Sequence, residues 1–260
     1  MKLRDKFWMW GHPEGIFNDR WGNNRPSRMT PMEACLYLGV KNNYMIALDW
    51  DVNIRQYNKS FTTLNEVGWE CYKACDDPAA LEPIIKEAAD FPNVKRIVFD
   101  DFVRLNGKQP IDMNNLPKIR DRLKNNEVRP MDMWMVVYTH DIGITTEGDD
   151  FHKEVLKSFD GAIMWNWEEK NIPQIPEKWE IFKRLTEGKK RQFGCYLWDF
   201  GTEKEATAEG VIWQLDWARE KILAGECEGV VFLTNTLADL DLVAFDAAIE
   251  WMNKHGDEEI

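Results

Sequence analysis

Two adjacent aspartates, Asp100 and Asp101, follow directly on the apolar run VKRIVF at residues 94–99. Like charges held side by side repel each other, so a chain that keeps them there needs a reason. They do not cap the next helix, because its pattern begins only near Asn114 or Asn115. Paired carboxyl groups can act as an acid and a base or nucleophile, so we interpret this pair as part of a functional cleft. Because successive strand residues point to opposite faces, we expect one carboxylate to face the cleft and the other to brace it.

Polar and aromatic side chains also follow the other apolar runs. Further carboxylates are Glu168 in MWNWEE and Asp199 in YLWDFG, each next to a tryptophan. A lone histidine at a strand end is most often structural, and tryptophans on helical stripes are packing residues. Those at strand ends are better placed to bind a ligand. The candidate substrate-binding residues are His12, Asp49, Trp50, Tyr138, His140, Trp165, Trp167, Trp198 and Asn235.

Eight short apolar runs recur along the chain, and most are followed by a segment with helical spacing. The runs span residues 7–10, 43–50, 69–75, 94–99, 133–138, 161–167, 193–198 and 229–233. Continuous apolar strands are typical of parallel sheets covered on both faces. Eight such units in about 250 residues predict a (β/α)8 TIM barrel, one domain spanning residues 1–260. A doubly wound open sheet is the alternative, but a dinucleotide-binding member would have a glycine-rich first turn, and here that turn is GHPEG.

Composition limits the class of partner. The 260 residues carry a formal net charge of −12, which disfavours nucleic acid and anionic membrane surfaces. No apolar stretch approaches the roughly 20 residues of a membrane span, and the N-terminus lacks the apolar region of a signal peptide. Five cysteines, an odd number, predict buried free thiols in a reducing compartment, so we expect a cytoplasmic protein. The oligomeric state is not predicted.

In this barrel the active site lies at the C-terminal ends of the strands, and three chemistries are common there. Phosphate binding is disfavoured, because the last strand runs into TNTLADLD without a glycine. A histidine-based metal site is disfavoured by the presence of only four histidines. A carboxylate-rich divalent site stays open as an alternative, with the ligands Asp49, Asp100, Asp101, Glu168 and His140. The third chemistry is glycoside hydrolysis, which needs two carboxyl groups beside a sugar.

The chain resembles the broad group of TIM-barrel glycoside hydrolases, without matching one family. Asp100 in VKRIVFDD looks like the aspartate with which many of them end strand four, and Glu168 or Asp199 could be its partner. The resemblance covers the architecture and about three strand ends. It implies hydrolysis of a small carbohydrate or glycoside without metal or other cofactor. Asp100 or Asp101 would be nucleophile or base, and Glu168, or less readily Asp199, the general acid.

Two other functions fit the same pattern. One is a metal-dependent sugar isomerase, aldolase or lyase, and the other is a carbohydrate-binding barrel without catalysis.

Overall fold

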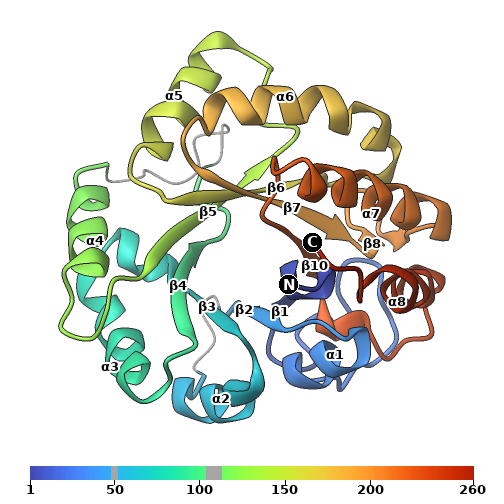
Figure 1. Ribbon diagram of the computed structural model, residues 1–260, viewed down its shortest axis with the longest axis horizontal. Coiled ribbons are helices and arrows are strands. Elements are labelled where there is room, and N and C mark those ends of the chain that lie inside the picture. Colours follow the sequence, from blue (N-terminus) through green and yellow to red (C-terminus); the bar gives the residue numbers. More distant parts are fainter. Residues whose placement is uncertain (48–51, 104–112) are drawn as a thin grey trace.

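The computed structural model describes residues 1–47, 52–103 and 113–260. In this part of the chain, eight parallel strands close into a barrel, with helices around its outside (Figure 1). Around the barrel the strands follow the order β1, β10, β7, β6, β5, β4, β3, β2. Their bounds are β1 Phe7–Gly11, β2 Asn42–Met45, β3 Glu66–Glu70, β4 Val94–Phe99, β5 Asp132–Tyr138, β6 Gly161–Trp165, β7 Lys190–Tyr196 and β10 Gly229–Leu233. The predicted (β/α)8 architecture is confirmed.

The described helices alternate with the barrel strands. They are α1 Pro31–Leu38, α2 Ile54–Ser60, α3 Glu82–Asp90, α4 Asn115–Lys124, α5 Thr146–Leu156, α6 Ile175–Leu185, α7 Ala208–Leu223 and α8 Val243–His255. Helix α1 begins with a capping box between Thr30 and Glu33, and proline occupies its first position. A two-stranded hairpin, β8 Trp198–Asp199 with β9 Lys204–Glu205, extends the segment after β7.

The second and third units differ from the sequence prediction. A strand was expected at residues 69–75, but β3 ends at Glu70, and Tyr72–Cys75 form a 3-10 helix. The run at residues 43–50 was also expected to be a strand, but β2 ends at Met45, and helix α2 follows at Ile54–Ser60. Pairing with β2 and β4 sets the position of β3 and outweighs the apolar run that follows it.

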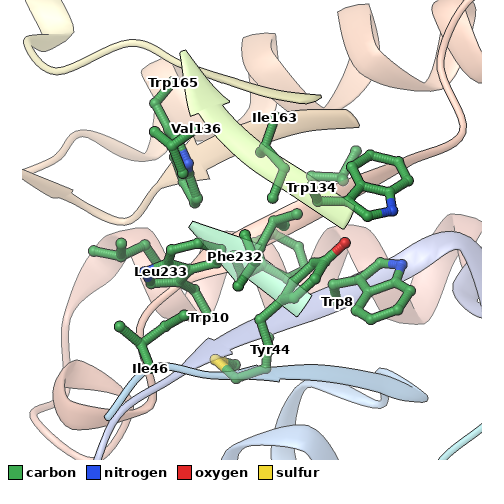
Figure 2. Close-up of a cluster of buried hydrophobic side chains, with 14 of the residues drawn as sticks. Trp8, Trp10, Tyr44, Ile46, Trp134, Val136, Ile163, Trp165, Phe232 and Leu233 are labelled. Carbon is green, nitrogen blue, oxygen red and sulfur yellow. The ribbon is translucent and has the colours of Figure 1, made fainter. Parts of the chain in front are cut away.

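Aromatic side chains fill the inside of the barrel. Residues two apart share a face of a strand, so Trp8 and Trp10 point inward together, as do Trp134 and Val136 (Figure 2). The Trp165 ring occupies the space beside Gly194, where an added Cβ would lie 1.9 Å from the ring.

A buried arginine packs inside the N-terminal half of the barrel. The Arg96 guanidinium lies over the rings of Trp8 and Trp134, 4.3 and 4.7 Å from their centroids. It donates a 3.1 Å hydrogen bond to Tyr44 Oη and pairs with Glu66 at 2.8 Å. These contacts neutralise the buried charge and fill this half of the barrel.

All five cysteines are buried and free, as predicted. Among the described residues, no helix has the length and apolar character needed to cross a membrane.

Candidate active site

Both strand-four aspartates line a cavity of about 200 Å³ at the C-terminal mouth of the barrel. Asp100 continues the inward face of β4, on which Arg96 and Val98 precede it. Asp101 would then point outward, but its backbone is left-handed, with φ of 50°. This conformation ends the strand alternation, and the second carboxylate also reaches the cavity. The expected division into one facing and one bracing residue is therefore replaced by a pair that shares the cavity.

Aromatic residues form the floor and walls of this cavity. Trp10, Trp165 and Tyr196 are buried residues of the barrel strands that line it. Phe17, Trp21, Trp167 and Phe200 come from the segments that follow β1, β6 and β7. The Trp167 ring meets those of Trp21 and Phe200 at centroid distances of 5.7 and 5.8 Å. Aromatic rings set at different angles therefore wall the cavity beside the two carboxylates.

Tyr138, at the end of β5, holds Asp101. Its hydroxyl donates a 2.9 Å hydrogen bond to Asp101 Oδ1. Burial raises the pKa of Tyr138 well above its ordinary value, and the neighbouring Asp100 raises it further. The phenol therefore keeps its proton and acts as a donor. The exposed His140 ring stacks on Tyr138, with 5.2 Å between centroids.

His12 lines the cavity as a neutral group. Its ring is buried, and Nδ1 lies 2.8 Å from Thr234 Oγ1. Removal from water lowers the pKa of His12 to about 3, so the imidazole is uncharged at neutral pH. A neutral imidazole can exchange hydrogen bonds with a sugar hydroxyl.

Asn235 joins segments below the cavity. Its Oδ1 accepts from the His12 backbone N–H at 2.7 Å, and its Nδ2 donates to the carbonyls of His12 and Met29 at 3.0 and 2.7 Å. These bonds tie the end of β10 to the segment after β1. Asn235 does not line the cavity, so the structure places it as a support of His12.

The other two predicted carboxylates do not line the cavity. Trp167 takes the cavity-facing position after β6, and Glu168 instead pairs with Lys170 at 2.8 Å. Asp199 lies in the hairpin, where its carboxylate accepts from the backbone N–H groups of Glu169 and Thr202 at 3.2 and 3.0 Å. The structure brings neither carboxylate into the cavity beside Asp100 and Asp101.

The predicted tryptophans take different places. Trp165 and Trp167 line the cavity, whereas Trp198 supports a loop by donating a 2.9 Å hydrogen bond from Nε1 to the Trp21 carbonyl. Asp49 and Trp50 lie outside the described residues.

Sequence reasoning missed the residues that the β1–α1 segment contributes. Ile16, Phe17, Arg20 and Trp21 all line the cavity, yet none follows a strand directly. The length of the connection between β1 and α1, residues 12–30, could have indicated these residues, because connections this long in compact domains are often functional.

No group of three or more histidine, cysteine, aspartate or glutamate side chains in the described part of the chain is arranged to hold a metal ion. The divalent site considered above includes Asp49, which lies outside that part.

No protein-family model matches the sequence, and no curated protein matches it. Among solved structures, the chain is similar to the catalytic domain of a hyperthermophilic chitinase from Pyrococcus furiosus. The TM-score is 0.65 at 12% identity, over 98% of this chain and 97% of that chain. It is also similar to tryptophan synthase from M. tuberculosis, with a TM-score of 0.53 at 10% identity, over 99% and 94% of the chains. At these identities the likeness is one of fold. The structural neighbours thus include a glycoside hydrolase barrel, and no single family is assigned.

Proposed function

We propose that the protein is a glycoside hydrolase acting on a small carbohydrate, with Asp100 and Asp101 as its catalytic carboxyl groups. The observation that carries the proposal is that both side chains line one aromatic-walled cavity at the C-terminal mouth of the barrel. This is the end at which such barrels place their active sites. The cavity, about 200 Å³, is smaller than the pockets that take drug-sized ligands, which supports a small glycoside.

The two carboxyl groups would divide the chemistry between them. The Tyr138 hydroxyl donates to Asp101, and a donated hydrogen bond stabilises a carboxylate in its ionised form. We therefore assign Asp101 as the nucleophile or base and Asp100, the other carboxyl group that lines the cavity, as the general acid. This assignment replaces Glu168 and Asp199 as candidates for the acid, because neither lines the cavity.

The reaction is a hydrolysis that leaves the enzyme unchanged. Asp100 gives its proton to the glycosidic oxygen as the bond to the anomeric carbon breaks, while Asp101 stabilises the positive charge that develops on that carbon. Water supplies the new hydroxyl group, and its other proton returns to the carboxyl pair. The face of either Trp167 or Trp21, whose rings are nearly perpendicular, can stack on the apolar face of the sugar ring, and His12 can bind a hydroxyl.

A panel of aryl glycosides and oligosaccharides tests the proposal. The wild type is expected to hydrolyse at least one member, and the double variant Asp100→Asn/Asp101→Asn to lose that activity. Asp150→Asn is the control for the substitution itself, because it makes the same Asp-to-Asn change at one exposed site on α5. Inactivity of the wild type on the whole panel would contradict the proposal.

Two further measurements separate the alternatives. Loss of activity after chelation, restored by a divalent ion, would favour the metal-dependent enzyme. Sugar binding without turnover, retained in the double variant, would favour a binding barrel.

A further inference from the structure

Arg20 brings a positive charge to the mouth of the cavity that Asp100 and Asp101 line. It is exposed and lies in the segment between β1 and α1. Among the described residues lining this cavity, Arg20 is the only lysine or arginine. Within the same described ranges, its guanidinium has no ion-pair or hydrogen-bond partner. A guanidinium without a protein partner at the entrance to a cavity can form an ion pair with an anionic ligand.

The backbone that carries Arg20 forms a tight turn. Asn23 donates a 2.9 Å backbone hydrogen bond to the Arg20 carbonyl, and the two central residues, Trp21 and Gly22, are left-handed, with φ of 54° and 74°. Positive φ at both positions is characteristic of a type I′ turn. A bulky residue such as tryptophan is rarely found in this conformation, and such residues cluster at functional sites.

Contacts with the segment after β7 hold this turn in place. Trp198 Nε1 donates to the Trp21 carbonyl at 2.9 Å. A Cβ on Gly22 would lie 2.3 Å from the Glu203 carbonyl oxygen, so the two backbones are in close contact. The Trp21 ring also packs against Phe200 at 6.0 Å. Arg20 therefore extends from an anchored turn, which reduces the conformational freedom lost when it binds a ligand.

Arg20 and the two aspartates are carried by different sides of the barrel mouth. The Arg20 turn is anchored next to β7, and β4, which carries the aspartates, lies three strands away around the barrel. His12 is neutral, as shown above, and adds no second positive charge. A ligand with a negative group at one end and a glycosidic bond at the other would complement this distribution.

We propose that Arg20 binds an anionic substituent of the sugar, a carboxylate or a sulfate, so that the substrates are acidic glycosides. This inference rests on the proposed function, since it takes the sugar to occupy the same cavity. The guanidinium fork matches both groups with two parallel hydrogen bonds, which a neutral hydroxymethyl group cannot form.

Equilibrium binding tests the inference independently of catalysis. Tryptophan fluorescence reports on the cavity, because Trp21, Trp165 and Trp167 line it. The probes are methyl glycosides in matched sets that differ only at carbon 6, as the hydroxymethyl, carboxylate or sulfate form, in the gluco and galacto series and both anomers. At least one anionic member is expected to bind about tenfold or more tightly than its neutral counterpart, and the preferred form distinguishes uronate from sulfate.

Three variants assign that preference to Arg20. Arg20→Gln should bring the anionic and neutral members to within about twofold of each other. Arg20→Lys should keep part of the preference, because it keeps the charge and loses the fork. Arg28→Gln, which removes the same charge from an exposed position in the same segment outside the cavity, should keep all of it.

The outcomes separate this inference from the proposed function. Equal or tighter binding of the neutral member in every set, or a preference unchanged in Arg20→Gln, would overturn the role of Arg20. A preference that depends on Arg20, found in a protein that hydrolyses none of the glycosides, would keep the role of Arg20 and overturn the hydrolase.

Discussion

The Tyr138 hydroxyl donates a 2.9 Å hydrogen bond to Oδ1 of Asp101, and both residues line the cavity at the mouth of the barrel. Tyr138 comes from β5 and Asp101 from the end of β4, so two neighbouring barrel strands build the contact. The pKa of Tyr138 is raised well above its ordinary value, so the donor persists through the working pH range. Asp101 is thus oriented by a fixed donor at the cavity wall.

Removal of this donor should lower activity without unfolding the protein. In Tyr138→Phe the ring and its stacking with His140 are kept, and Asp101 loses one hydrogen bond. We expect kcat to fall about 10- to 100-fold, with KM little changed, since the bond stabilises charge used in the transition state. Steady-state kinetics on the best glycoside of the panel measures this. An unchanged kcat would show that the hydrogen bond has no catalytic role.

The two aspartates should respond differently to the leaving group. With Asp100→Asn, hydrolysis should fall about a thousandfold for poor leaving groups such as alcohols and much less for dinitrophenol, which departs without a proton. With Asp101→Asn, hydrolysis should fall about a thousandfold for every leaving group. Asparagine tolerates the left-handed backbone at position 101, so folding should be kept. The reverse pattern would exchange the two roles.

Glu168 provides the test of the alternative acid. Its carboxylate pairs with Lys170 and accepts from Asn171 rather than facing the cavity. We expect Glu168→Gln to keep kcat within about threefold of the wild type, and to change the free energy of unfolding by about 0.5 kcal/mol or less, since the partner is exposed. A loss of activity comparable to that of Asp100→Asn would restore Glu168 as the acid.

His12 should make stability depend on pH. Burial lowers its pKa from 6.5 to about 3, so between these values the unfolded chain binds a proton that the folded protein does not. The free energy of unfolding therefore falls as pH decreases from 6.5, by about 2 kcal/mol at pH 5 for this group alone. Urea denaturation at pH 7 and pH 5 measures the difference. His12→Gln, which cannot titrate, should show a smaller decrease. An equal decrease in both proteins would contradict the assignment.

Gly194 should be required for the position of Trp165 in the cavity. A Cβ there would lie 1.9 Å from the indole, so Gly194→Ala should displace the ring. We expect a loss of about 2–3 kcal/mol in the free energy of unfolding and at least a tenfold fall in kcat/KM. Gly188→Ala is the control, because no atom lies within 4 Å of the added Cβ. Its φ of 72° alone should cost about 1 kcal/mol. Equal stability of the two variants would show that the ring adapts.

Local pattern was enough to predict the architecture. Continuous apolar runs and stripes with helical spacing recur often enough to define a barrel, because burial acts on each element through its own sequence. The C-terminal ends of the same runs placed Trp165 and Tyr138 near the mouth of the barrel, and both line the cavity. Where local pattern and pairing disagreed, as at residues 69–75, the barrel pairing set the position of the strand.

Only the tertiary structure decided which carboxylates meet. Beyond the last paired residue of a strand, a single backbone angle sets the direction of a side chain, as at Asp101, and apolar patterning does not encode that angle. The wall that carries Arg20 depends on a hydrogen bond between Trp21 and Trp198, residues 177 positions apart. Packing of this kind arises when the closed barrel brings the ends of β1 and β7 to one rim, and no local sequence window contains both partners.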